Sequence, residues 1–64
     1  MADYTRKVLE ILSDNGCYFV RRGKGDHNIW YTPILNRNFT VDGSITKWTS
    51  ANWTLKAAGI NRKI

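Results

Sequence analysis

The sequence predicts an α+β domain in which a helix, three antiparallel strands and a second helix follow one another, with both helices on one face of the sheet. Three observations predict this fold: apolar residues at helical spacing near the start, a stretch rich in β-forming residues broken by glycine turns, and a second helical stretch near the end. With 64 residues, the chain is expected to form one domain, residues 1–64, with one thin core and no deep cavity.

The first helix is expected over about residues 3–15. Its apolar side chains recur at the spacing of one helical face, which we expect to lie on the core: Tyr4, Val8, Ile11 and Leu12. Asp3 or Thr5 is suited to the N-cap. Gly16 follows the last helical position and can adopt the left-handed conformation that ends many helices.

A β-hairpin is expected next. Residues 17–21 are rich in β-forming side chains, and the Gly-Lys-Gly-Asp sequence after them is typical of a turn. The second strand is therefore expected over residues 27–32.

A third strand is expected over residues 39–41. Pro33 and the asparagines within residues 36–38 mark the turn that precedes it, and residues 42–43 end it. Both connections are short, so the three strands are expected to form an antiparallel sheet.

The second helix is expected over residues 51–58, with Ser50 as its N-cap and Gly59 after its end. Residues 44–49 leave two possibilities open, a helical turn or an apolar plug. Trp48 is expected in the core, because a small domain needs large rings to fill its interior.

Charge indicates the class of partner. Ten basic residues against five acidic ones give a net charge of +5 and a sequence pI near 9.8. Such an excess attracts polyanions without specifying which one. The basic side chains Arg21, Arg22 and Lys24 crowd the hairpin turn before the only histidine, His27. A nucleic acid is therefore the first partner to consider, and solubility is the alternative reason for the charge.

Several function classes are disfavoured. The lone Cys17 permits no internal disulfide and no cysteine-cluster zinc site, and the carboxylates show no ligand spacing, so no metal or other cofactor is expected. No stretch approaches the ~20 apolar residues of a membrane span. The first residues also lack the apolar centre of a signal peptide, so a cytoplasmic location is the default expectation.

Strand alternation predicts where His27 points. Side chains two apart share a face, so His27 groups with Ile29 and Tyr31, and Trp30 lies on the other face. Tryptophan can bury about 150–250 Å², so its face is assigned to the helices and His27 to the open face. The alternative buries Ile29 and Tyr31 and makes His27 a structural histidine at the edge of the core.

Several segments occur in an order and spacing that a known family shares: Asp14-Asn15-Gly16-Cys17-Tyr18, Val20-Arg21, Gly25-Asp26-His27, Ile29-Trp30, Phe39-Thr40-Val41 and Leu55-Lys56-Ala57-Ala58-Gly59-Ile60. Over nearly its whole length, the chain resembles the HicA family, the toxins of type II toxin–antitoxin systems. The resemblance implies a fold similar to double-stranded RNA-binding domains. It also implies an endoribonuclease that cleaves mRNA and arrests growth until a HicB-type antitoxin protein binds it, a free monomer that forms a hetero-oligomer with the antitoxin.

The family's catalytic histidine corresponds to His27. RNA carries its own nucleophile, so one histidine can act as the general base on the ribose 2′-hydroxyl and yield a 2′,3′-cyclic phosphate. Lys24 or Arg22 would stabilise charge on the phosphoryl oxygens, and water, Lys24 or another group of the RNA would protonate the leaving oxygen. EDTA is expected to leave cleavage intact. The expected RNA-binding residues are Arg21, Arg22, Lys24, Gly25, Lys47 and Lys56.

Two acidic residues differ from the family pattern. Asp26 replaces the commoner serine, where it could weaken phosphate contact or stabilise protonated His27. Asp42 stands where many members have proline, and residues 42–48 are expected near the RNA-facing edge. Trp53 lies off the apolar stripe of its helix, which indicates either an antitoxin contact or partial burial.

Two other functions fit the same charges. One is a binding module that grips duplex RNA without cleaving it, and the other is a protein whose basic face binds an acidic partner. Replacing His27 by alanine should abolish cleavage and leave RNA affinity largely intact if this residue is catalytic.

Overall fold

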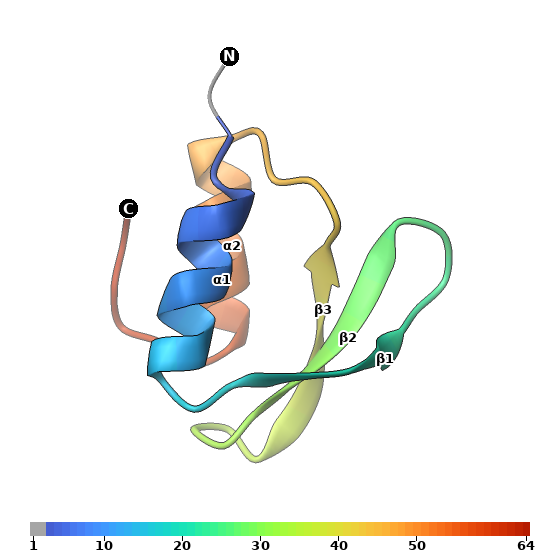
Figure 1. The fold of residues 1–64 in the computed structure, drawn as a ribbon. Helices are drawn as coiled ribbons and strands as arrows, with labels where there is room; N and C mark the ends of the chain where they lie inside the picture. Colours follow the sequence, from blue (N-terminus) through green and yellow to red (C-terminus); the bar gives the residue numbers. More distant parts are fainter. Residues whose placement is uncertain (1–2) are drawn as a thin grey trace.

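The chain folds into a three-stranded antiparallel sheet with two helices on one of its faces, which confirms the predicted α+β class and element order (Figure 1). The computed structural model describes residues 3–64. Strands follow one another across the sheet in the order β1-β2-β3, so β2 is central and β3 has a free edge. The elements are α1 (Thr5–Asp14), β1 (Tyr18–Arg22), β2 (His27–Thr32), β3 (Arg37–Asp42) and α2 (Trp48–Ala57).

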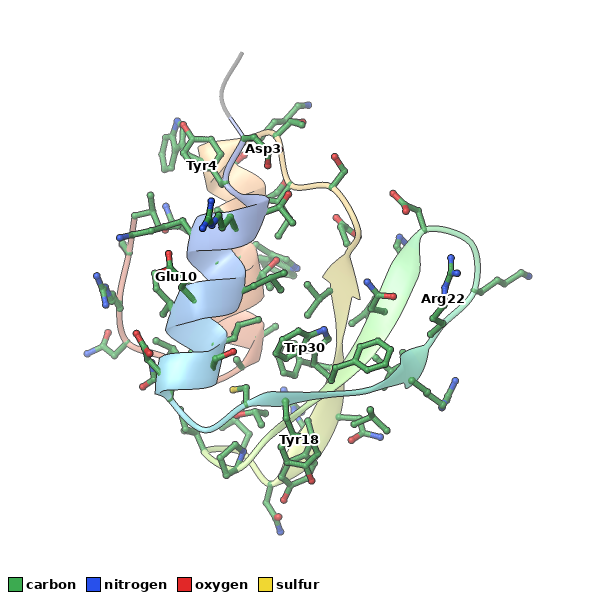
Figure 2. All side chains as sticks on the ribbon, in the orientation of Figure 1. Asp3, Tyr4, Glu10, Tyr18, Arg22 and Trp30 are labelled. Carbon is green, nitrogen blue, oxygen red and sulfur yellow. The ribbon has the colours of Figure 1, made fainter. Side chains whose placement is uncertain are left out.

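The core lies between the two helices and the covered face of the sheet. Burying the side chain of a valine, leucine or isoleucine contributes about 1.5–3 kcal/mol to the stability of the fold. Trp30 packs against the core from β2, on the helix side of the sheet as the alternation predicts (Figure 2). The buried apolar residues are Val8, Ile11, Leu12, Cys17, Phe39, Val41, Ile45, Ala51, Leu55, Ala58 and Ile60.

The predicted N-cap of helix α1, Asp3 or Thr5, is wrong: Tyr4 occupies this position without a side-chain capping bond, and Thr5 is the first residue of the helix. Asp3 accepts a hydrogen bond at its Oδ1 atom from the Thr5 N–H, 2.9 Å away. This bond lowers the pKa of the Asp3 carboxyl because it favours the charged form. After the helix, Gly16 has φ of +85°, as expected for the residue that ends it.

Helix α2 starts earlier than predicted. It begins at Trp48, and Lys47 occupies the N-cap with extended backbone and no side-chain cap. The predicted N-cap, Ser50, lies inside the helix, where its carbonyl accepts a hydrogen bond from the Thr54 hydroxyl at 2.9 Å. A serine before an apolar stripe predicts an N-cap from local sequence alone. Tertiary packing can override such a local preference.

The segment between β3 and α2 contains the apolar plug, and Ile45 forms it. Its N–H donates to the Thr5 hydroxyl at 2.7 Å, and its carbonyl accepts from the Tyr4 N–H at 2.8 Å. The expectation that Trp48 is a core residue is wrong, because its side chain is 58% exposed. Ile45 is buried in the core below the start of α2, and Trp48 therefore remains at the surface.

Strand β3 is longer than predicted because its first residues pair across the sheet. Arg37 lies opposite Thr32 and Asn38 opposite Tyr31, which confines the turn to residues 33–36. The buried Thr32 hydroxyl donates to the Ala58 carbonyl at 2.6 Å and joins the sheet to the end of α2. None of the helices within residues 3–64 is both long and apolar enough to cross a membrane.

Candidate functional site

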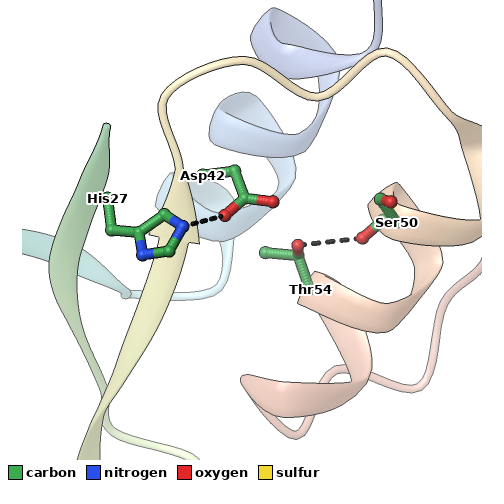
Figure 3. Close-up of polar contacts among 4 residues, drawn as sticks. All are labelled: His27, Asp42, Ser50 and Thr54. Atoms are coloured by element: carbon green, nitrogen blue, oxygen red, sulfur yellow. Dashed lines mark hydrogen bonds and ion pairs between the residues drawn. The ribbon is translucent and has the colours of Figure 1, made fainter. Parts of the chain in front are cut away.

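The central feature of the site is a pair formed by His27 and Asp42. The two residues lie directly opposite one another on β2 and β3, at the end of the sheet where β2 begins and β3 ends. The Nε2 atom of His27 is 3.1 Å from the Oδ1 atom of Asp42 (Figure 3). Both side chains remain accessible, with 57% of the histidine and 51% of the aspartate exposed.

This contact determines which imidazole nitrogen is free. A carboxylate can only accept hydrogen bonds, so a hydrogen bond between these two atoms requires the proton to be on Nε2. In the neutral ring the Nδ1 atom then holds a lone pair. An oriented imidazole with one free basic nitrogen, accessible to a ligand, is the arrangement that a general base requires.

The faces of the sheet separate His27 from the core. On β3, Phe39 and Val41 are buried, and they lie opposite Trp30 and Asn28. Residues in register share a face, so the helix-covered face carries these side chains. His27 lies on the open face, as the alternation predicts.

The basic turn joins directly onto His27. The Gly23 N–H donates to the His27 carbonyl at 2.8 Å, and the His27 N–H donates to the Lys24 carbonyl at 3.3 Å. Gly25 has φ of +63°, and a Cβ placed on it would meet no atom within 4 Å. The turn therefore needs a glycine for its backbone conformation and leaves open space above it.

A β-bulge decides which arginine shares the face of His27. The register of β1 on β2 shifts between Phe19 and Arg21, so that Arg21 lies opposite Ile29 and Arg22 opposite Asn28. Arg21 is therefore on the open face, together with His27, and Arg22 is on the other face. In a strand without the extra residue, the two arginines would exchange faces.

The two predicted lysines of α2 lie at opposite ends of the helix. Lys47 precedes its first residue and Lys56 is in its last turn. Their positions differ by nine, which corresponds to about 14 Å along a helix axis. Lys47 is thus at the end near Asp42, whereas Lys56 is remote from His27 and lies beside Arg37.

Sequence reasoning missed the role of Asp42. It took this aspartate as a departure from the family pattern and considered Asp26 as the carboxylate that stabilises His27. In the structure Asp42 contacts the imidazole, whereas the Asp26 carbonyl accepts the Gly43 N–H at 2.7 Å. The length of the β2–β3 turn could have predicted this pair, because a turn of residues 33–36 places residues 27 and 42 opposite one another.

A hollow opens beside Asp42, between the free edge of β3 and α2. Its other lining residues are polar except for one exposed tryptophan, and they are Thr40, Thr49, Ser50, Trp53 and Thr54. Within residues 3–64, no group of three or more histidine, cysteine, aspartate or glutamate side chains is placed to hold a metal ion. His27 lies on the open face of the sheet and 57% of its side chain is exposed.

Comparisons of this chain with protein-family models, with curated proteins and with solved structures gave no match.

Proposed function

We propose that this protein is a toxin of a type II toxin–antitoxin system that acts in the cytoplasm as a metal-independent endoribonuclease on mRNA. The observation that carries the proposal is the His27–Asp42 pair, an oriented and accessible imidazole at the base of a basic turn. The resemblance to the HicA family supports the same assignment, because its catalytic histidine corresponds to His27.

In the proposed mechanism, the Nδ1 atom of His27 takes the proton from a ribose 2′-hydroxyl. The 2′-oxygen then bonds to the adjacent phosphorus, the bond from phosphorus to the 5′-oxygen breaks, and a 2′,3′-cyclic phosphate results. The leaving 5′-oxygen takes a proton from Lys24 or from water. Asp42 is a positioning residue in this mechanism, because it contacts the imidazole and does not contact the reacting atoms.

Charge on the phosphoryl oxygens is stabilised by the basic turn. Lys24 lies in the turn and Arg21 shares the face of His27, so these two cations are the best placed of the predicted set. Arg22 lies on the other face and fits a contact with a neighbouring phosphate of the strand. Gly25 allows the RNA backbone to approach the turn closely.

The test is cleavage of an unstructured RNA by the wild-type protein and by H27A. We expect the wild type to cleave with or without EDTA and to leave 2′,3′-cyclic phosphate ends. H27A should lose about a hundredfold or more in rate while keeping its circular dichroism spectrum and its RNA affinity. An RNA with a 2′-deoxyribose at the cleaved position should resist, since it lacks the nucleophile.

Induced expression tests the toxin assignment in cells. The wild type should arrest growth and H27A should not. Co-expression with the acidic antitoxin of the HicB type that we propose as partner should restore growth. Intact RNA and normal growth with folded wild-type protein would contradict the proposal, and RNA binding without cleavage would favour the non-catalytic RNA-binding module.

A further inference from the structure

Trp53 on α2 is the most exposed large apolar side chain among residues 3–64, with 71% of its surface accessible. An exposed tryptophan ring does not contribute the stabilisation that burial of its large apolar surface would give. Trp53 belongs neither to the buried core nor to the partly buried apolar residues packed against it. The ring of Trp53 is therefore accessible to a ligand.

Trp53 borders three hollows, and together they form what we call the Trp53 groove. One hollow reaches Asp42 along β3. A second runs toward Arg37 and Lys56. The third shares Lys56 and continues to Arg62 and Lys63 in the C-terminal segment. Trp53 thus lies between the His27–Asp42 pair and a group of cations.

The groove follows the free edge of β3. Arg37 begins this strand and Asp42 ends it, a separation of about 17 Å at the usual rise of a strand. Trp53 borders the hollows at both ends. A chain molecule that left the face of His27 past Asp42 would therefore cross Trp53 before it reached Arg37 and Lys56.

The lining has the chemistry of a single-stranded nucleic-acid site. Asp42 is its only acidic residue, and that carboxylate is already paired with His27. Cations that follow a phosphate backbone, together with an exposed aromatic ring, are the parts that such sites combine. Stacking requires an unpaired base, because duplex RNA presents its grooves and phosphates to a protein.

A protein partner fits the lining less well. The centre of a protein interface is apolar and depleted in charge, whereas the apolar members here are scattered among threonine, serine, asparagine and basic residues. We propose that the Trp53 groove binds single-stranded RNA, with Trp53 stacked on an unpaired base and Lys56 and Arg37 on the phosphates beside it. This inference rests on the proposed function in taking RNA as the substrate.

The experiment measures binding of a fluorescein-labelled, unstructured RNA of twelve nucleotides by anisotropy, with H27A as the parent protein so that no RNA is cleaved. Adding W53A should weaken binding about 5- to 150-fold, which corresponds to about 1–3 kcal/mol for the loss of one stacking aromatic, and W53F should restore most of the affinity. W48A is the matched control, because Trp48 is also an exposed tryptophan on α2. It lies about 140° around the helix axis from Trp53 and borders none of these hollows. W48A should bind like the parent.

Two further measurements separate stacking from charge. RNA should quench the tryptophan fluorescence of the parent and of W48F, and W53F should lose most of this quenching. K56A and R37A should each reduce the salt dependence of log Kd by about 0.7, while W53A and the α1 control K7A should leave it unchanged.

Unchanged affinity in W53A, or equal losses in W53A and W48A, would overturn the inference and leave the groove to a protein partner. Failure of the H27A parent to bind the RNA would overturn it as well. A wild type that cleaves no RNA but binds it through Trp53 would contradict the proposed ribonuclease and support the groove.

Discussion

The Oδ1 atom of Asp42 lies 3.1 Å from the Nε2 atom of His27 because the β2–β3 register sets the two residues opposite one another. In the proposed mechanism this contact orients the imidazole of His27. We expect D42A to lower the cleavage rate by up to about a hundredfold through misplacement of the base, with the melting temperature nearly unchanged. D14A, at the exposed end of α1, is the control. Equal rates for D42A and D14A would show that Asp42 does not position His27.

The bulge in β1 predicts unequal roles for two neighbouring arginines. Arg21 shares the face of His27 and Arg22 does not, so R21A should reduce the cleavage rate more than R22A does. Each variant removes one cation, and the salt dependence of RNA binding by the H27A parent reports whether that cation contacts a phosphate. A greater loss of cleavage in R22A would contradict the assignment of faces.

Gly25 is expected to tolerate asparagine better than alanine. Its φ of +63° is unfavourable for alanine, at a cost of about 1–2 kcal/mol, and asparagine adopts this conformation more readily. No atom lies within 4 Å of an added Cβ, so steric overlap contributes nothing. In a domain of this size each kcal/mol lowers the melting temperature by about 4–8 °C, which thermal unfolding of G25A and G25N will measure. Equal melting temperatures would contradict the prediction.

Thr32 is expected to matter for stability through its hydroxyl. It donates to the Ala58 carbonyl at 2.6 Å and accepts from the Ile34 N–H at 3.2 Å. T32V keeps the shape but removes these bonds, and should lower the free energy of unfolding by about 1–3 kcal/mol. T40V, at an exposed position of β3, is the control. Urea unfolding compares the two, and a change in T32V no larger than in T40V would count against the role of the hydroxyl.

Asp3 is expected to make α1 sensitive to acid. Its hydrogen bond from the Thr5 N–H lowers the pKa of the carboxyl, so the folded state favours the charged form. The stabilisation is present above the unfolded-state pKa and is lost as the pH falls through the lower folded-state value. D3N should therefore narrow the difference in melting temperature between pH 6 and pH 3. An unchanged pH dependence would exclude this contribution.

Much of the fold follows from signals within a few residues of one another. The spacing of Val8, Ile11 and Leu12 indicates a helix with a core face, and Gly16 and Gly59 end the two helices with positive φ. The hairpin turn before His27 lies where its glycines indicate. These features are local because helical periodicity and turn conformation depend on neighbouring residues.

The remaining features of the fold and the site depend on contacts between segments that are distant in the sequence. Asp42 becomes the partner of His27 through strand register, and the bulge selects Arg21 over Arg22. Ile45 fills the core in place of Trp48, and α2 places Trp53 beside the free edge of β3. Register and packing depend on which segments meet in space, and one extra residue in a strand reverses the faces beyond it. The sequence therefore sufficed to predict His27 on an open face, while its orienting partner and the groove beside it depended on the folded arrangement.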